Sequence, residues 1–470
     1  MDRISHIYFV GIKGVAMTAL ALYLRDRGYR ITGSDVDEKF PTDEYLEKAG
    51  IPVQNGFLTD HVLSDGRPDL VIYTGAHSGI HNVEVEEAIS LGIPVEAHGK
   101  ALGRFMEVGK QISVAGSHGK TTTTAILATI LSHAGLDPSY VIGCGEVFGL
   151  GASGHYGTGS YFVAEADEYP TDPTSDSTPR FLWQKPDILI VTNVDYDHPD
   201  AYHSLAEIHS AFQRFLGQRK KDNVTILSAD DTESIPLRDS SSVLVGTSDD
   251  ADVRVHDVVF GDRTTEFTLS SSGEGSTRCV LRIPGMHNAL NAAMAAVAAR
   301  SCGVSWDDVK GGLQRFSGTK RRFEKIGEGN GVVLYDDYAH HPSEITATLR
   351  GTRDWYPGRR IISVFQPHTY SRTKALFSSF VQAFAGSDMT IITDVYGSAR
   401  EKDTLGVDIR ELVSEAKHHT ESLYAKGRDE VRAVLLRAVK PGDVILFMGA
   451  GDIYIWARTL VKDLETAGLA

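Results

Sequence analysis

Strand-like apolar runs alternate with longer helical patterns along most of this 470-residue chain. The alternation is typical of parallel sheets covered by helices, because each parallel connection has to cross back over the sheet. The runs fall into three groups, which begin at HIYFVG (6–11), QISVAGS (111–117) and GVVLYDDY (331–338). We therefore predict an α/β protein with three domains, 1–107, 108–314 and 315–470.

The charge and the cysteine content narrow the class of protein. With 47 Lys and Arg against 62 Asp and Glu, the net charge is -15, which argues against a nucleic-acid surface. The three cysteines lack CxxC spacing, so they indicate a reducing compartment and neither a disulfide framework nor a zinc site. No segment has about 18 uninterrupted apolar residues, and the N-terminus lacks the apolar core of a signal peptide. We expect a cytoplasmic protein that binds neither nucleic acid nor membranes.

The first glycine turn, VGIKGVAM (10–17), follows a predicted strand and opens a predicted helix. Its backbone N–H groups could hold a phosphate at the helix N-terminus. Lys13 and Ala16 stand where a dinucleotide fingerprint has its second and third glycines. Asp35, at the end of the next strand, could bind a ribose hydroxyl. A tight strand-to-helix turn and a solvated turn aspartate are the alternatives at this stage.

The second glycine turn, AGSHGKTTTT (115–124), is a stronger candidate for phosphate binding. Gly116 and Gly119 let the backbone curl around an anion, Lys120 can reach terminal phosphates, and the Thr121 hydroxyl can bind Mg²⁺. Val114 replaces the leading glycine of the common nucleotide-binding loop, so the loop is shorter. The alternative is a helix N-cap with a solvated lysine. The loop alone predicts phosphate binding without specifying a reaction.

Polar residues follow two apolar strands of the second group. The segments are YFVAEADE (161–168), with Glu165, Asp167 and Glu168, and DILIVTNVDYDHPD (187–200), with Asn193, Asp195, Asp197 and His198. Ends of parallel strands gather on one edge of a sheet, here beside the phosphate loop. Mg²⁺ prefers oxygen ligands, so the sequence predicts a magnesium site at this edge.

Eight segments in this order resemble the motifs of the Mur ligase family: GSHGKTT, EADE, TNVDYDHPD, PGMHNALNAA (284–293), FSGTKRRFE (316–324), YDDYAHHPSE (335–344), FQPHTYSRT (365–373) and GAGD (449–452). The likeness runs from about residue 6 to residue 455. It implies an N-terminal Rossmann-like UDP-binding domain, a central P-loop-type ATPase domain with a parallel sheet, and a C-terminal Rossmann-like domain. The motifs are most similar to those of members that add L-alanine to UDP-N-acetylmuramate.

The resemblance implies an ATP-dependent amide ligase. ATP would phosphorylate the carboxylate of UDP-N-acetylmuramate, and the amine of L-alanine would attack the acyl phosphate. Lys120 and Mg²⁺ would offset charge on the transferring phosphate. The protein would be a monomer or a homodimer, and closure of the domains would complete the site.

The resemblance also implies roles for individual residues. The catalytic set would be Lys120, His198 and Arg322, and the metal ligands Thr121, Glu165 and His198. ATP would be bound by Gly116, Ser117, His118, Gly119, Lys120, Thr121, Thr122, His287, Asn288, Asn291, Arg322 and Asp337. The nucleotide sugar would be bound by Gly11, Lys13, Gly14, Val15 and Asp35, and the amino acid by His340, His341, His368 and Arg372.

The planar fork of Arg372 suits a carboxylate, because it can donate two parallel hydrogen bonds. For His340 and His341, a capped turn before Pro342 is the alternative. Thr369 stands where many family members have arginine, so one expected cation is missing.

Two segments depart from the family pattern. TGAHSGIHN (74–82) replaces a segment of small residues and proline, and YPTDPTSDSTP (169–179) is longer than the usual spacer. We expect the longer segment to loop over the cleft. These changes affect nucleotide-sugar recognition more than the ATP chemistry.

Other protein classes explain fewer of these motifs. A ligase that recycles a whole tripeptide resembles the chain in the first two domains, although FQPHTYSRT fits a single-amino-acid ligase better. A folylpolyglutamate synthase lacks the first domain. An NAD(P)-dependent dehydrogenase leaves the GKT loop unused, a P-loop switch or motor ATPase leaves the first domain unexplained, and a non-catalytic nucleotide-binding module leaves the metal ligands idle.

Overall fold

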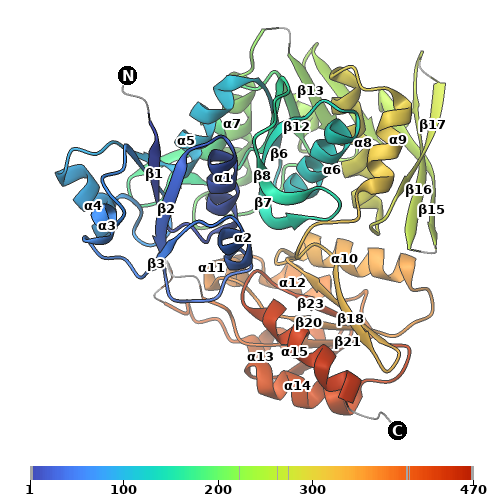
Figure 1. Cartoon of the computed structure of the whole chain (residues 1–470). Helices are drawn as coiled ribbons and strands as arrows, with labels where there is room; N and C mark the ends of the chain where they lie inside the picture. Colours follow the sequence, from blue (N-terminus) through green and yellow to red (C-terminus); the bar gives the residue numbers. More distant parts are fainter. Residues whose placement is uncertain are drawn as a thin grey trace.

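The computed structural model describes residues 4–221, 223–261, 263–273, 275–397, 401 and 403–466. Within these residues the strands form three main sheets and one separate two-stranded hairpin. Figure 1 shows the first domain in blue beside the central domain, with the C-terminal domain in orange and red below both. The predicted three-domain α/β fold is confirmed. We propose boundaries near residues 108 and 315, which fall between the last helix of one sheet and the first strand of the next.

The sheet of the first domain is parallel, with the strand order β3-β2-β1-β4-β5 of a Rossmann-like half. Its strands are β1 (His6–Val10), β2 (Arg30–Asp35), β3 (Val53–Asn55), β4 (Leu70–Tyr73) and β5 (Val95–Ala97). Its helices are α1 (Val15–Asp26), α2 (Asp43–Lys48), α3 (His61–Ser64), α4 (Val83–Ser90) and α5 (His98–Phe105), with short 3-10 turns η1 (Gly79–His81) and η2 (Met106–Val108).

The central domain is built on a ten-stranded sheet in the order β17-β16-β15-β14-β13-β12-β6-β9-β7-β8. The strands are β6 (Lys110–Ala115), β7 (Ser139–Val147), β8 (Gly151–His155), β9 (Tyr161–Glu165), β12 (Ile188–Val191), β13 (Val224–Ser228), β14 (Ser242–Gly246), β15 (Val253–Gly261), β16 (Thr264–Ser271) and β17 (Gly275–Leu281). The helices are α6 (Lys120–His133), α7 (Leu205–Leu216), α8 (Met286–Ser301) and α9 (Trp306–Arg315), with η3 (Arg180–Trp183) and η4 (Ile235–Leu237). The strands β6, β9 and β12 are parallel, so their ends meet at one edge beside the phosphate loop.

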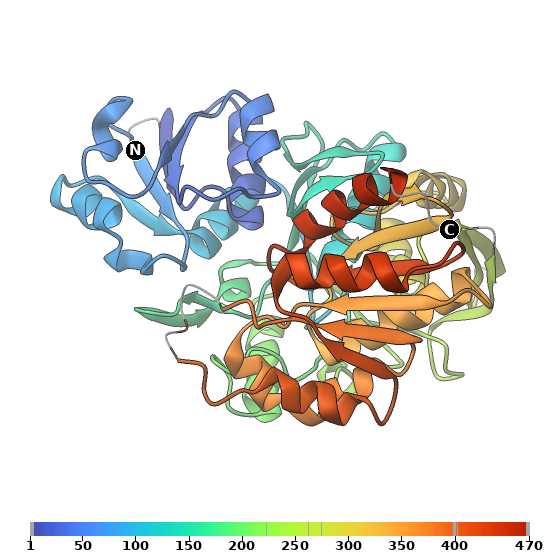
Figure 2. The ribbon, with the colours of Figure 1, turned by 90° about the horizontal axis from the view of Figure 1, so that it is seen from below.

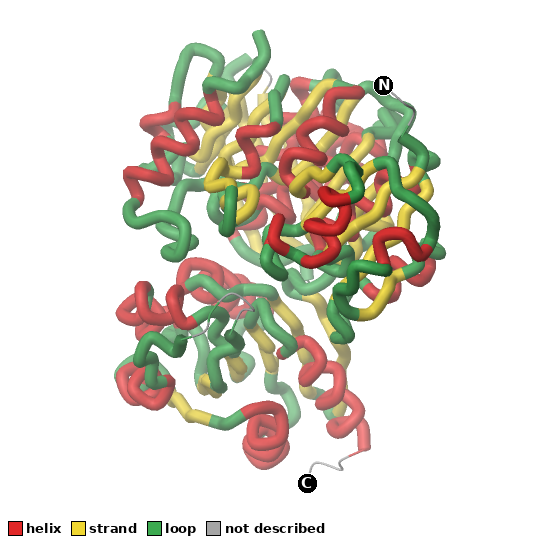
Figure 3. Tube along the Cα trace, turned by 90° about the vertical axis from the view of Figure 1, so that its left-hand side faces the viewer, coloured by secondary structure: helices red, strands yellow, loops and turns green. Residues whose placement is uncertain are grey.

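The C-terminal sheet has the order β18-β19-β23-β20-β21-β22, with only β18 antiparallel to its neighbour. Its strands are β18 (Glu324–Gly329), β19 (Val332–Asp337), β20 (Ile361–Phe365), β21 (Met389–Ile392), β22 (Glu421–Tyr424) and β23 (Val444–Met448). Its helices are α10 (Pro342–Trp355), α11 (Tyr370–Ala375), α12 (Phe377–Ala383), α13 (Ile409–Ala416), α14 (Gly427–Ala438) and α15 (Ile453–Thr466). Figure 3 shows this domain as a separate lobe, with helices on both faces of its strands.

The first and central domains share one hydrophobic core. Val141, Phe162 and Ala164 of the central sheet are buried in the same cluster as the apolar residues of α1. The ring of Phe162 lies 4.9 Å from that of Tyr23, and Gly154 leaves no room for a side chain against the backbone of α1. In Figure 1, α1 lies directly beside β7 and β8. These two domains therefore form one packed unit.

The C-terminal domain contacts this unit through side chains of three of its helices: Ser343 of α10 donates to Asp195, Arg372 of α11 to Asp197, and Tyr454 of α15 to the carbonyl of Lys39. Seen from below in Figure 2, it lies against the central domain while the first domain stands to one side. Among the described residues, no helix combines the length and the apolar character needed to cross a bilayer.

Candidate active site

The phosphate loop lies between β6 and α6, as predicted from the sequence. Gly116 and Gly119 have φ values of 131° and 82°, which side chains rarely tolerate. A side chain at Gly116 would also overlap the hydroxyl of Thr192. The loop therefore needs both glycines to bring its backbone to the N-terminus of α6, where N–H groups favour an anion.

Lys120 lies folded over this loop. Its ammonium donates hydrogen bonds to the carbonyl of Gly116 (2.6 Å) and to the Glu168 carboxylate, with Nζ 2.9 Å from Oε2. Burial alone would lower the pKa of Lys120, but the charge of Glu168 outweighs it and raises the pKa above its ordinary value. The side chain is therefore a cation at neutral pH, held over the loop by Glu168.

The predicted metal ligands fall into two neighbouring groups. The Thr121 hydroxyl donates to Glu165 Oε2 at 3.1 Å, and Glu165 Oε1 accepts the Gly143 N–H at 2.6 Å. His198 instead lies with Asp167 and Glu168, and their potential ligand atoms are within 4.8 Å of one another. Burial raises the pKa of Glu165. Both groups offer the oxygen donors that Mg²⁺ prefers, so the residues fit this ion.

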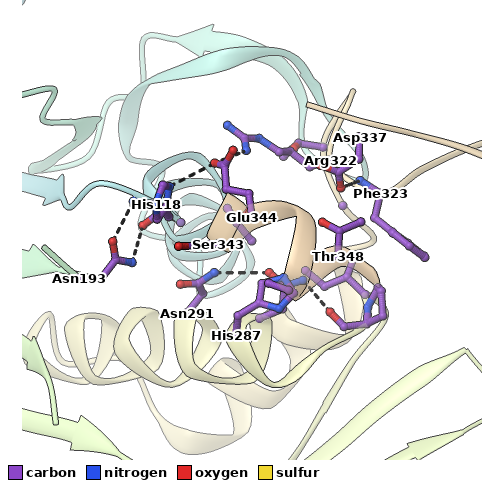
Figure 4. A pocket seen from close by; sticks show the side chains of 18 of the residues that line it. His118, Asn193, His287, Asn291, Arg322, Phe323, Asp337, Ser343, Glu344 and Thr348 are labelled. Atoms are coloured by element: carbon purple, nitrogen blue, oxygen red, sulfur yellow. Dashed lines mark hydrogen bonds and ion pairs between the residues drawn. The ribbon is translucent and has the colours of Figure 1, made fainter. Parts of the chain in front are cut away.

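A cavity of about 430 Å³ beside the phosphate loop brings together the predicted ATP-binding residues of three segments. Figure 4 shows the cavity with His287 and Asn291 on one helix and with Arg322 and Asp337 opposite them. The predicted residues in its lining are His118, Gly119, Thr122, His287, Asn288, Asn291, Arg322 and Asp337. Burial lowers the pKa of His287 to about 4, so its ring is neutral and suited to an uncharged base. These roles in ATP binding remain predictions.

A second cavity, of about 660 Å³, is lined by residues of all three domains. Gly14 and Val15 come from the first domain. The phosphate loop and the acidic strand ends come from the central domain, and the residues predicted to bind the amino acid come from the C-terminal domain. The predicted residues in the lining are Gly14, Val15, Ser117, His118, Gly119, Lys120, Thr121, Glu165, His198, Arg322, His340, His368 and Arg372. Among the described residues, Gly11, Lys13, Asp35 and His341 are not part of this lining, and neither are Gly116 and Thr122.

Arg372 is bound to the central domain. Its Nε and Nη2 atoms lie 3.0 and 2.9 Å from Asp197 Oδ1, and both side chains are buried. Burial acts to lower the pKa of Arg372, but the Asp197 carboxylate acts in the opposite direction, and the pKa lies above its ordinary value. His368 Nδ1 is 3.5 Å from the guanidinium, and burial lowers the pKa of His340 to about 4. The predicted amino-acid site thus combines one permanent cation with a neutral imidazole.

His341 has the capping position that was the alternative to substrate binding. Its ring accepts the Ser343 N–H at the start of α10, and the Glu344 carboxylate accepts the N–H of His341 in return. Its side chain is buried and lies 4.6 Å from the ring of His118. A direct contact of His341 with the amino acid stays a prediction.

The first glycine turn is hydrogen-bonded to the segment that begins at Asp35. Asp35 accepts the N–H of Lys13 at 2.7 Å, and burial raises the pKa of this carboxyl. The Lys13 ammonium donates to the carbonyls of Val36 and Glu38. Binding of the nucleotide sugar by Gly11, Lys13 and Asp35 also stays a prediction.

Glu344 is a central residue to which the sequence motifs gave no role. It lines both cavities, and its carboxylate lies 3.4 Å from His118 Nδ1 and 3.6 Å from Arg322 Nη1. Figure 4 shows Glu344 between these two cations. Burial raises its pKa, but His340, His118 and Arg322 together hold it well below the ordinary value. The spacing of His341 and Glu344 matches a capping box, which could have indicated a fixed carboxylate at this position.

His118 and Glu344 lie at the junction of the two cavities. The residues that line both are His118, Gly119, Arg322 and Glu344. Burial lowers the pKa of His118, but hydrogen bonds to Asp195 and Glu344 raise it to about 10. A group that passes from one cavity to the other therefore moves past two cations, His118 and Arg322.

The long segment at 169–179 forms an antiparallel hairpin, β10 (Pro170–Asp172) and β11 (Asp176–Pro179). Its Asp172 is fully buried and accepts the N–H of Ile80 at 2.9 Å. The two segments that depart from the family pattern, 74–82 and 169–179, therefore contact each other. The flanking residues Tyr169 and Arg180 line the second cavity, while the hairpin rests on the first domain.

Comparisons with known proteins agree along the whole chain. Three family descriptions match it: "Mur ligase family, catalytic domain" at residues 6–109, "Mur ligase middle domain" at 114–299, and "Mur ligase, glutamate ligase domain" at 321–451. The UDP-N-acetylmuramate–L-alanine ligase of Desulfitobacterium hafniense (strain Y51) is 37% identical over 461 residues, which cover 97% of this chain and 99% of the relative.

Solved structures with a similar fold include two Mur-type ligases. The UDP-N-acetylmuramate-alanine ligase of Thermotoga maritima has a TM-score of 0.81 and 27% identity, covering 98% of this chain and 99% of its own. A murein peptide ligase from Psychrobacter arcticus has a TM-score of 0.73 and 26% identity, covering 99% of this chain and all of its own. With three matching domains and full-length relatives, the chain belongs to the Mur ligase family.

Proposed function

We propose that this protein joins L-alanine to the carboxylate of UDP-N-acetylmuramate in an ATP-dependent reaction, the first peptide-forming step of peptidoglycan synthesis. Mur ligases are ATP-dependent, and the full-length relatives with 37% identity carry this activity in their names. The observation that carries the proposal is the meeting of the two cavities at the phosphate loop. One suits a nucleotide, and the other is large enough for a second substrate bounded by all three domains.

The order of events follows from the arrangement of charges. ATP lies in the smaller cavity with its phosphates on the loop from Gly116 to Thr121. The substrate carboxylate enters the larger cavity near Lys120, which offsets the charge of the γ-phosphate as it transfers. His118 and Arg322 stabilise the same phosphate where the cavities meet. Thr121 and Glu165 would hold Mg²⁺, which would supply further charge neutralisation, and His198 would hold a second metal ion.

The amino acid completes the reaction from the C-terminal domain. Arg372 binds its carboxylate with His340 and His368 beside it, so that the amine faces the acyl phosphate. The neutral amine attacks the acyl carbon and forms the carbon–nitrogen bond; the nitrogen loses a proton to solvent, and the acyl carbon–oxygen bond breaks to release phosphate. Because Arg372 is paired with Asp197 in the structure, alanine has to share or replace that ion pair. We also propose a cytoplasmic location, since ATP and a UDP-linked sugar are cytoplasmic substrates. We propose further that the protein is a monomer or a homodimer.

The test is an assay of the purified protein with ATP, Mg²⁺ and UDP-N-acetylmuramate. L-alanine, L-serine, glycine and a stem tripeptide are offered separately, and amide product is followed by mass spectrometry. We expect product and phosphate release with L-alanine only when both other substrates are present. Product with the tripeptide alone would favour the recycling ligase, and no amide product with any of them would overturn the assignment.

A further inference from the structure

We propose that Lys13 is a positioning residue that holds residues 36–43 as a strap between the nucleotide-sugar cavity and the C-terminal domain. The inference rests on the proposed function for its ligand, UDP-N-acetylmuramate. It assigns Lys13 a role other than direct contact with the diphosphate.

The Lys13 side chain is committed to the strap. Its ammonium donates to the carbonyls of Val36 (3.0 Å) and Glu38 (2.9 Å) and lies 3.6 Å from the Asp43 carboxylate. The side chain is only 9% exposed. A lysine ammonium has three donors, and two of them are used by these carbonyls. The charge is therefore satisfied inside the first domain.

The backbone of Lys13 is tied to the same strap. Its N–H donates to Asp35, the residue just before the strap, and its carbonyl accepts the hydroxyl of Thr42. Both ends of the strap are thus anchored on one residue. Glycine, the residue expected at this position of the turn, could keep the backbone bonds but would lose both bonds from the ammonium.

The strap reaches both the cavity and the other domains. Phe40 and Pro41 line the larger cavity. The Tyr454 hydroxyl of α15 donates to the carbonyl of Lys39 at 3.2 Å, which connects the strap to the C-terminal domain. Just after the strap, Tyr45 donates to Glu146 of the central domain at 2.6 Å.

The contacts at Tyr45 extend the connection to the segment between the central and C-terminal domains. Lys320 Nζ donates to the Tyr45 hydroxyl at 3.0 Å and lines the larger cavity. If the strap is loosened at Lys13, Phe40 is no longer held in the wall of the larger cavity. The Lys39 carbonyl is then no longer held in place as the acceptor for Tyr454. None of the described residues of the strap lines the smaller cavity, so ATP binding should be insensitive to the change.

The test compares Lys13→Met and Lys13→Gly with the wild type and with Lys310→Met. Lys310 is the control, because it is a lysine on the surface of α9 that pairs with Asp307 and lines neither cavity. Calorimetry measures the Kd of UDP-N-acetylmuramate and of ATP separately. We expect the Kd of the nucleotide sugar to rise about tenfold in both Lys13 variants, as for the loss of a hydrogen bond from a charged donor. The Kd of ATP in the Lys13 variants, and both Kd values of Lys310→Met, should stay within about twofold of the wild type.

A second measurement does not depend on the substrate. Hydrogen exchange of the ligand-free protein should be faster in peptides spanning 36–45 of Lys13→Met, with little change in peptides of α6. Tyr454→Phe should also raise the Kd of UDP-N-acetylmuramate. In the double variant Lys13→Met with Tyr454→Phe, this Kd should be no higher than in the single variant with the higher Kd. Additive effects would mean that the two residues act separately and would overturn the strap.

The remaining outcomes are also decisive. Unchanged exchange at 36–45, or equal weakening of ATP and nucleotide sugar, would overturn the positioning role. If the wild type fails to bind UDP-N-acetylmuramate, the proposed function fails, whereas the exchange experiment still decides whether Lys13 holds the strap.

Discussion

Replacing Asp337 with asparagine should weaken ATP binding and also change how the stability of the protein depends on pH. Asp337 ends β19 in the smaller cavity, where its two oxygens accept the N–H groups of Ala339 (2.7 Å) and Phe323 (2.9 Å). Burial raises the pKa of Asp337 to about 6, although Arg322 acts in the opposite direction. At pH 7.5 the group is a carboxylate with lone pairs left for ribose hydroxyls. Asparagine has one acceptor oxygen, and its amide would meet a backbone donor.

The size of both effects follows from these contacts. Hydrogen bonds to a charged acceptor contribute about 1.5–3 kcal/mol, so the Kd of ATP should rise about 10- to 100-fold at pH 7.5. Because the pKa of Asp337 is raised in the folded protein, its protonation stabilises the fold at low pH, and this contribution is lost as the pH rises through about 6. Between pH 5 and pH 8 the free energy of unfolding of the wild type should fall by about 1.4 kcal/mol because of Asp337. The asparagine variant should not show this loss.

The assay combines nucleotide calorimetry at pH 7.5 with urea unfolding at pH 5 and pH 8. Asp429→Asn, an exposed carboxylate of the same domain, is the control and should behave as the wild type in both measurements. The variant should therefore gain stability relative to the wild type as the pH rises. Parallel pH dependence of Asp337→Asn and the wild type, or an ATP Kd within twofold, would refute the reasoning.

Three further substitutions separate the proposed roles. Lys120→Met should abolish turnover with an unchanged circular dichroism spectrum, because the cation over the phosphate loop is lost; near-normal turnover would exclude its phosphate role. Arg372→Lys should raise the KM for L-alanine about tenfold or more, since a point charge replaces a planar fork, and an unchanged KM would remove Arg372 from the amino-acid site. Glu165→Gln should raise the Mg²⁺ concentration needed for half-maximal turnover, and it should weaken Mn²⁺ binding measured by electron paramagnetic resonance; equal metal affinity in variant and wild type would contradict its role as a ligand.

Much of the fold and part of the site could be predicted because the signals are local. The phosphate loop is identified by a strand, two glycines and a helix in immediate succession. His287, Asn288 and Asn291 share one end of α8, so a single helix places all three in the same cavity. Parallel strands then bring Glu165 to the same sheet edge as the loop.

The roles that sequence could not predict depend on partners far along the chain. The ammonium of Lys13 is used by carbonyls more than 20 residues away, so its sequence position beside a glycine turn says little about its ligand. The hairpin at 169–179 has the turn-forming composition of a loop, but Asp172 pairs with the backbone 92 positions earlier. Glu344 lies in a recognised motif, yet its neighbours His118 and Arg322 come from two other segments.

The core that α1 shares with the central sheet sets an order for folding during synthesis. Val141, Phe162 and Ala164 cover α1, and all three follow the first domain in the chain. Domains generally fold as they leave the ribosome, from the N-terminus onward. Here the first hundred or so residues cannot complete the burial of α1 until β9 has emerged, so the nascent first domain stays incomplete while the phosphate loop is being made. A ribosome-bound chain that stops near residue 107 should therefore be more sensitive to protease than one that extends well beyond residue 164.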